Sequence, residues 1–124
     1  MKRTFHVAGE EDIKSGRVTD VYFARTLEIL KAKGIEKRVR AEFFAKKLPG
    51  GYGWGLLAGI EEVARLMEGK PVNIRSFREG EVFYPWEPVV EIEGRYADFC
   101  VFETALLGLI CESTGVATKS ARIR

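Results

Sequence analysis

The chain has 124 residues, of which 46% are hydrophobic and 31% are charged. A chain of this length forms one domain with its own hydrophobic core, and the composition excludes a disordered tail, a collagen-like repeat and a low-complexity linker. The 20 lysines and arginines nearly balance the 18 aspartates and glutamates, so the charge gives no reason to expect binding to nucleic acid or to a membrane.

The first half of the chain predicts a helix, a strand and a second helix. Thr19 or Asp20 is a suitable N-cap for a helix that ends at Gly34. Residues 37–48 alternate between apolar and polar side chains, which is typical of a strand with one wet face. A glycine-rich turn then leads to apolar side chains at helical spacing over residues 54–68, which predicts a second helix.

The second half predicts two strands and a buried helix. The strands cover residues 72–77 and 88–94, and an almost wholly apolar helix follows over residues 97–113. Residues 1–124 should therefore form an α+β domain, in which a small mixed or antiparallel sheet packs with helices. The basic stretch after Gly115 carries no stop signal, which suggests a polypeptide cut at a domain boundary.

One glycine motif resembles a dinucleotide fingerprint. Residues 53–58 read GWGLLA between a strand and a helix, and Glu79 follows about 20 positions later, as that fingerprint requires. However, the preceding strand is amphipathic, and Pro49 begins an insertion that lengthens a turn which should be tight. The alternative is a loop whose glycines let a backbone approach closely.

The charged residues also have two interpretations. Lys46–Lys47 ends the amphipathic strand, and Lys119, Arg122 and Arg124 are spaced along one turn of a helix beginning after Thr118. These cations either make the surface soluble or form a cluster that binds phosphate. Glu103 falls in the buried helix, so we expect it to pair with Lys119, Arg122 or a partner chain.

The remaining composition indicates a reduced, metal-free and cytoplasmic domain. Cys100 and Cys111 would lie about 16 Å apart along one helix, too far to form a disulfide. His6 is the one histidine, so no metal site is expected. No apolar run reaches the length of a membrane span, and the first residues lack the apolar region of a signal peptide. Asn73 is the one amide side chain, which suggests a thermophilic source.

Six blocks of the chain carry a further signal: TDVY (19–22), AEFFAKKLPGG (41–51), WGLLAGIEEVARLME (54–68), EIEG (91–94), FETALL (102–107) and GVATKSARIR (115–124). In this order they resemble segments of nicotinate phosphoribosyltransferases and are most similar to archaeal members. The resemblance runs from about residue 10 to the last residue.

The resemblance implies a role in a larger enzyme. Such enzymes join nicotinate to phosphoribosyl pyrophosphate, giving nicotinate mononucleotide and pyrophosphate, with Mg²⁺ and coupled ATP hydrolysis. Their N-terminal α/β domain precedes an α/β barrel that holds most catalytic groups. The chain would be this N-terminal domain without its barrel, inactive alone, and without catalytic residues or cofactors of its own. It would act in a homo-oligomer through contacts between domain and barrel of different subunits.

The resemblance also assigns roles to residues. Asp20 and Tyr22 match positions that reach into the neighbouring subunit's barrel, where the tyrosine stacks on the pyridine ring. Lys46 matches a basic residue expected to hold phosphate oxygens of the ribosyl donor. Lys119 and Arg122 would lie near the barrel mouth, in the same electropositive funnel or paired with the buried carboxylate.

Two alternatives stay open. A related class of phosphoribosyltransferases acts on quinolinate and resembles this chain in its GVAT block. The resemblance implies that this class uses an arginine to bind the second carboxylate of quinolinate at the position where this chain has Glu103. A carboxylate at that position would repel a dicarboxylate. The other alternative is a stand-alone binding module, in which Tyr22 and the lysines form a protein interface.

Overall fold

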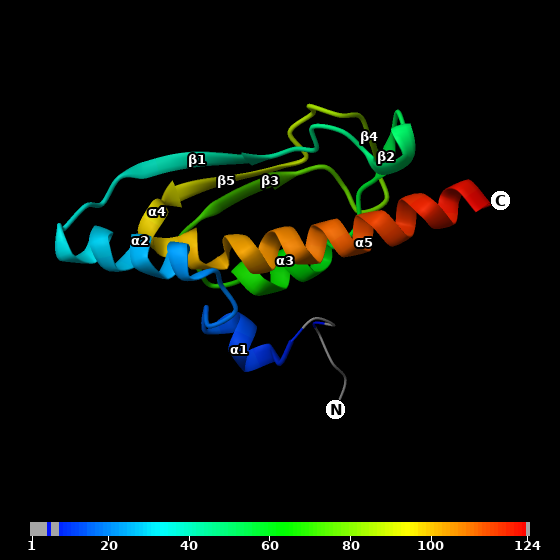
Figure 1. The fold of residues 1–124 in the computed structure, drawn as a ribbon. Helices are drawn as coiled ribbons and strands as arrows, with labels where there is room; N and C mark the ends of the chain where they lie inside the picture. The colour runs from blue at the N-terminus through cyan, green and yellow to red at the C-terminus, as the bar shows by residue number, and fades with distance from the viewer. Residues whose placement is uncertain (1–4, 6–7, 124) are drawn as a thin grey trace.

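A three-stranded antiparallel sheet lies on a layer of helices in the computed structural model, which describes residue 5 and residues 8–123 (Figure 1). The strand order is β1–β5–β3, and a second, two-stranded antiparallel sheet pairs β2 with β4. This confirms the predicted α+β class. In chain order the elements are α1 (Glu10–Lys14), α2 (Val21–Ala32), β1 (Arg38–Phe43), the 3-10 turn η1 (Pro49–Gly51), β2 (Gly55–Leu56), α3 (Ile60–Met67), β3 (Asn73–Ser76), β4 (Val82–Phe83), β5 (Val90–Arg95), α4 (Tyr96–Phe99), the 3-10 turn η2 (Cys100–Phe102) and α5 (Glu103–Ile123).

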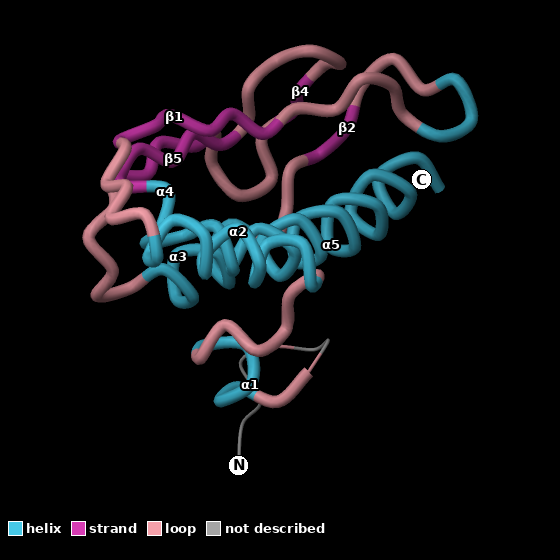
Figure 2. The backbone as a smooth tube through the Cα atoms, turned by 60° about the vertical axis from the view of Figure 1, so that its left-hand side comes forward, coloured by secondary structure: helices cyan, strands magenta, loops and turns pink. Residues whose placement is uncertain are grey.

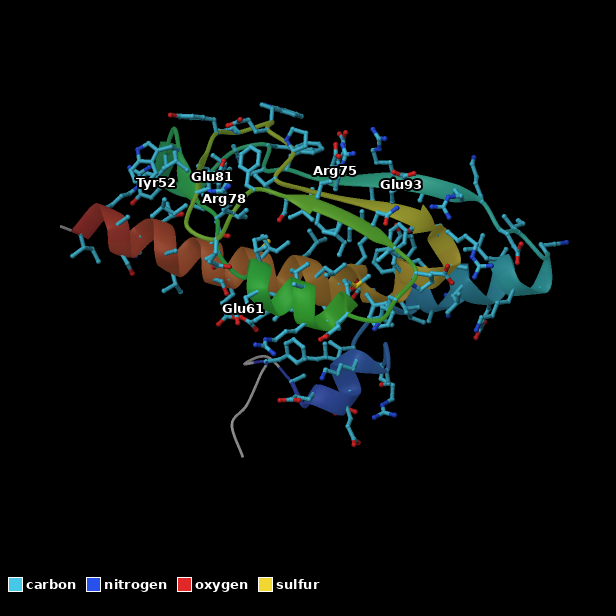
Figure 3. All side chains as sticks on the ribbon, turned by 180° about the vertical axis from the view of Figure 1, so that it is seen from behind. Tyr52, Glu61, Arg75, Arg78, Glu81 and Glu93 are labelled. Atoms are coloured by element: carbon cyan, nitrogen blue, oxygen red, sulfur yellow. The ribbon has the colours of Figure 1, made fainter. Side chains whose placement is uncertain are left out.

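The alternation predicted for β1 is confirmed by its pairing with β5. Ala41 lies opposite Ile92 and Phe43 opposite Val90, and these side chains face the helices. The other face carries charges, and Figure 3 shows Arg75 and Glu93 projecting from it away from the helical layer. One face of the sheet therefore belongs to the core and the other meets solvent.

The helix α2 ends as its sequence predicts. Gly34 adopts φ +63°, a left-handed conformation that glycine reaches without a Cβ penalty. The N–H of Ile35 donates to the carbonyl of Leu30 at 2.9 Å, and the N–H of Gly34 donates to that of Lys31 at 3.2 Å. This pair of bonds satisfies carbonyls that the helix end would leave open, and it turns the chain into β1.

The longest helix, α5, contributes several buried side chains to the core and is longer than the sequence predicted. It continues through Gly115 to Ile123, so the expected end near residue 113 and the separate basic helix after Thr118 are both wrong. A glycine costs a helix only about 1 kcal/mol, and contacts of α5 with β2 and α3 outweigh this cost. The largest fully buried side chains are Phe5, Phe99, Ile13, Leu57, Leu66, Ile92, Leu106, Leu109, Val63, Val90 and Cys100.

The second predicted helix begins six residues later than expected. Residues 54–58 are extended, and Gly55 pairs with Phe83 in the small second sheet. Two hydroxyls of α5 hold this segment, because Thr118 Oγ1 accepts from the N–H of Leu56 at 2.9 Å and Thr114 Oγ1 accepts from that of Ala58 at 3.1 Å. The apolar spacing predicts the helix correctly for Val63 and Met67, whereas Leu57 is buried in the core without being helical.

Gly59 makes the transition from this extended segment into α3 possible. Its φ is +91°, and a Cβ placed there would lie 2.6 Å from the carbonyl oxygen of Leu109. The backbones of the two segments are therefore in contact, which only a residue without a side chain permits. Figure 2 shows the consequence, with the β2–β4 pair and the glycine-rich loop gathered above the C-terminal half of α5.

Candidate functional site

The first of two candidate regions lies at the N-terminal end of α5 and contains Asp20 and Tyr22. Asp20 occupies the N-cap position of α2, and its N–H donates to Thr104 Oγ1 at 3.3 Å, which fixes the start of α2 beside the start of α5. Tyr22 follows in the first turn of α2 and is 65% exposed. Its ring leans on Phe23 with 4.5 Å between ring centroids. The aromatic face is therefore held at the surface.

A tyrosine and a carboxylate lie next to this region. The hydroxyl of Tyr96 donates to Glu103 Oε2 at 3.3 Å. Burial raises the pKa of Tyr96 to about 12, and the negative charge of Glu103 and its hydrogen bond add to the rise. Tyr22 makes the smallest contribution to the same rise. The N-terminal end of α5 thus combines an exposed ring with a half-buried negative charge.

The expected ion pair between Glu103 and either Lys119 or Arg122 is wrong. All three residues lie on α5, and the 16 residues from Glu103 to Lys119 span about 24 Å at 1.5 Å per residue. A straight helix cannot bring such positions together. Tyr96 takes the place of the predicted cation, so the partial burial of the carboxylate is compensated by a neutral donor.

The second candidate region surrounds the loop between β1 and β2. Lys46 and Lys47 are exposed at its beginning. A cavity of about 460 Å³ lies against this loop, and a groove of about 630 Å³ lies between the loop and α5. Lys47 and Lys119 both line the groove, so the structure brings these two cations to one surface. The groove is mainly apolar and includes Phe43, Phe44, Leu48, Leu57, Phe83, Leu107, Ile110 and Thr114.

Arg122 belongs to the same region but is engaged by the protein itself. Its guanidinium carbon lies 3.5 Å from the ring centroid of Tyr52 and 4.2 Å from that of Trp54. Its Nη2 donates to the carbonyl oxygen of Trp54 at 2.9 Å. Figure 3 shows Tyr52 beside the C-terminal end of α5. These aromatic partners carry no sequence signal that links them to a residue about seventy positions away.

The two regions lie far apart on one chain. The 15 residues from Thr104 to Lys119 span about 22 Å of helix α5. Tyr22 is therefore remote from Lys119, and one substrate group cannot contact both side chains of the same chain. The electropositive funnel expected from the sequence concerns the second region alone, where Lys46 lines the cavity and Lys119 lines the adjoining groove, and its role in binding stays a prediction.

The dinucleotide interpretation does not fit the geometry. Glu79 is present where the fingerprint needs an acidic residue, but its carboxylate accepts from the N–H groups of Gly59 and Ile60, both at 2.9 Å, and of Glu61 at 3.3 Å. A pyrophosphate on that fingerprint would use the same helix N-terminus. The carboxylate caps α3 and occupies this position.

Other reactive groups offer no catalytic or metal centre among the described residues. Both cysteines are free; Cys100 is buried, which raises the pKa of its thiol, while Cys111 is exposed. No three His, Cys, Asp or Glu side chains gather as metal ligands within residue 5 and residues 8–123, and His6 and Arg124 lie outside the described residues. The helical segment Tyr96–Ile123 has the length and composition of a membrane span, but it packs against both sheets as a core helix.

Comparisons with known proteins identify relatives that are about three times longer. The chain is 52% identical to a nicotinate-nucleotide pyrophosphorylase from Pyrococcus furiosus, with a TM-score of 0.92, over 99% of this chain and 31% of that one. It is 28% identical to nicotinate phosphoribosyltransferase pncB1 of Mycobacterium tuberculosis, over 93% of this chain and 32% of that protein. Human nicotinic acid phosphoribosyltransferase, at 22% identity and a TM-score of 0.78, shares the fold over 86% of this chain and 28% of that one.

The sequence profile of the quinolinate phosphoribosyl transferase N-terminal domain matches residues 20–114, which is most of the chain. This match begins at the N-cap of α2 and ends within α5, so it contains both strands and helices that define the α+β core. The chain spans about a third of the relatives it matches. The chain therefore belongs to the family of quinolinate phosphoribosyl transferase N-terminal domains.

Proposed function

We propose that the chain is the N-terminal domain of a nicotinate phosphoribosyltransferase and that it completes the active site of a partner subunit. The exposed ring of Tyr22 carries this proposal, because the N-cap of α2 and its bond to Thr104 hold an aromatic face outward at a defined place. The enzyme would join nicotinate to phosphoribosyl pyrophosphate in the cytoplasm. Mg²⁺ and ATP would serve the complete enzyme.

The chemistry of this reaction gives Tyr22 a reason to be exposed. When the pyridine nitrogen of nicotinate attacks the ribose carbon, the C–N bond forms, pyrophosphate leaves, and the pyridine ring becomes cationic. An aromatic face attracts a cation more strongly than a neutral ring, by about 1 kcal/mol. The contact therefore strengthens toward the transition state and raises the rate rather than the affinity alone.

Glu103 favours nicotinate over quinolinate. Its carboxylate accepts from the hydroxyl of Tyr96, and Glu103 lies one residue before Thr104, which binds the N-cap of α2, so this end of the domain adds negative charge to any site it completes. That charge attracts a developing pyridinium but repels the second carboxylate of quinolinate. The family profile bears the name of the quinolinate enzymes, and quinolinate is therefore the second candidate substrate.

The cations of the second region are proposed to bind phosphate groups. Lys46 and Lys47 begin a glycine-rich loop at a cavity, and Lys119 faces the neighbouring groove. Lysine binds phosphate oxygens as a point charge, which suits a ligand with several phosphates. Since about 22 Å of helix separates Thr104 from Lys119, this region and Tyr22 would serve different active sites of an oligomer.

A domain exchange tests the proposal. The first third of the Pyrococcus furiosus relative is replaced by this chain, which superposes on it with a TM-score of 0.92. We expect the hybrid to assemble as the parent does and to use nicotinate, relative to quinolinate, more than the parent does, because the barrel is common to both proteins and only this domain differs. A ratio shifted toward quinolinate would support the second candidate. A hybrid that has the parent's solution mass and is inactive with both acids would contradict the proposal and favour a stand-alone module.

A further inference from the structure

The guanidinium of Arg122 is enclosed rather than presented to solvent. Tyr52 lies 3.5 Å and Trp54 lies 4.2 Å from its central carbon, and the carbonyl oxygen of Trp54 accepts from Nη2 at 2.9 Å. Its Nε is buried and has no hydrogen-bond partner among the described residues. Arg122, Tyr52 and Trp54 are each half-buried, and a cation that is partly shielded from water is attracted to ring faces more strongly than an exposed one.

The loop that Arg122 holds is anchored at one end by Leu48, which packs against the core, and the two glycines that follow give it little further restraint. Gly50 and Gly51 are consecutive and adopt φ of +68° and +69°, so this stretch loses much conformational freedom when it is ordered. The N–H of Tyr52 donates to the carbonyl of Pro49 at 3.4 Å, a long bond within the loop. The contacts of Arg122 instead join the loop to α5.

The same loop carries the lysines proposed to bind phosphate. Lys46 and Lys47 line the cavity of about 460 Å³ together with Gly50, Gly51 and Tyr52. Tyr52 is thus shared, since one face of its ring contacts the guanidinium of Arg122 and the residue also lines this cavity. A change in its position would alter the cavity wall and the placement of both lysines.

We propose that Arg122 is a positioning residue, which clamps the loop of residues 46–54 to the C-terminal end of α5 and so orients Lys46 and Lys47 without contacting substrate itself. The orientation part of this inference rests on the proposed phosphate-binding role of the loop. Arginine suits a clamp better than lysine, because its planar group stacks on an aromatic ring while its N–H groups donate in the plane.

Limited digestion with trypsin tests the clamp on the chain itself, since the protease cleaves after Lys46 and Lys47. Cleavage of a transiently opened loop follows the population of its open form. We expect Arg122→Met to accelerate cleavage at these two sites about tenfold, the factor that corresponds to about 1.4 kcal/mol of lost cation–π and hydrogen-bond contacts. Arg65→Met is the matched control, because it removes an exposed arginine of α3 that pairs with Glu61.

The Tyr52→Leu variant gives an independent measurement of the same clamp. It should accelerate the same two cleavages. The double variant Tyr52→Leu with Arg122→Met should be cleaved no faster than the faster single variant, because both changes remove the same contact between Tyr52 and Arg122. Equal acceleration at every lysine and arginine, with a lower unfolding midpoint, would show a contribution to global stability only. That result, or unchanged cleavage in Arg122→Met, would overturn the clamp.

Inorganic pyrophosphate separates the clamp from the phosphate-binding proposal. In the unsubstituted chain, we expect pyrophosphate to slow cleavage after Lys46 and Lys47, and in Arg122→Met we expect weaker protection at equal concentration. Protection that is equal in both chains would refute orientation of the lysines by Arg122. Absence of protection in the unsubstituted chain, together with selective acceleration in Arg122→Met, would refute phosphate binding by the loop and leave the clamp established.

Discussion

The two ends of α5 place aromatic and charged groups in opposite ways. At its N-terminal end Tyr22 is 65% exposed, and the half-buried carboxylate of Glu103 accepts a hydrogen bond from the hydroxyl of Tyr96. At its C-terminal end the rings of Tyr52 and Trp54 cover a cation, while lysines remain exposed on the adjoining loop. The first surface is suited to a ring that gains positive charge, and the second is suited to an anion.

This difference indicates which changes should affect folding and which should affect function alone. The C-terminal end depends on close backbone contacts and side-chain hydrogen bonds between distant segments, whereas Tyr22 makes few contacts of its own. Substitutions near the second sheet should therefore lower stability, and substitution of Tyr22 should not.

The largest effect is expected at the N-cap of α3, where its backbone meets the middle of α5. Gly59→Ala would place a Cβ 2.6 Å from the carbonyl oxygen of Leu109 at a φ of +91°. Left-handed strain of about 1–2 kcal/mol and overpacking of about 1–3 kcal/mol predict a loss of about 3 kcal/mol in the free energy of unfolding. Denaturant unfolding measures it, with Gly69→Ala, a left-handed glycine in open space, as the control.

A loss in Gly59→Ala no greater than that in Gly69→Ala would mean that left-handed strain alone matters. The close approach of the two backbones would then not limit this position.

A smaller loss is expected at Thr118, the buried polar residue whose hydroxyl accepts from the N–H of Leu56 at 2.9 Å. Thr118→Val keeps the shape but leaves this buried donor without a partner, which costs about 1–3 kcal/mol. Thr118→Ser keeps the hydroxyl and should retain most of that stability. Equal losses in the two variants would show that the methyl group, not the hydrogen bond, holds the second sheet on α5.

The sequence predicted the parts of the fold that local patterns determine. Residues 38–43 alternate, and Gly34 follows a helix that needs a left-handed end, so the strand and the helix boundary were found. The β2–β4 sheet was missed because two residues per strand leave no periodic signal. Its stability comes from Thr114 and Thr118, about sixty positions away, which local reasoning cannot connect.

The candidate site shows the same limit. Family resemblance located Tyr22 and the lysines, and their roles stay predictions. It could not show that Arg122 is enclosed by Tyr52 and Trp54, because that contact depends on α5 continuing straight through Gly115. Helical geometry alone would have excluded a pair between Glu103 and Lys119 once the helix was known to be continuous.

The exposed ring should affect catalysis without affecting stability. Tyr22→Ala should change the free energy of unfolding by less than about 0.5 kcal/mol, as expected of an exposed position. In the Pyrococcus furiosus hybrid it should lower the turnover of nicotinate about fivefold, the factor that corresponds to about 1 kcal/mol of cation–π attraction. Tyr22→Phe keeps the ring and should keep most of the turnover. Unchanged turnover in Tyr22→Ala would remove this residue from the site.

The last effect is confined to alkaline pH and concerns Tyr96, whose pKa of about 12 results first from burial and then from the nearby charge of Glu103. Because the ordinary pKa is 10.0, the folded chain holds this proton more tightly than the unfolded chain does. The stability from this difference is fully present below pH 10 and declines as the pH rises toward 12. Alkaline unfolding of the chain and of Tyr96→Phe, compared with phenolate absorbance, measures this decline. If the two chains lose stability in parallel over that interval, neither burial nor Glu103 holds the proton of Tyr96. The carboxylate of Glu103 would then be exposed to solvent. A solvent-screened charge would discriminate poorly between nicotinate and quinolinate.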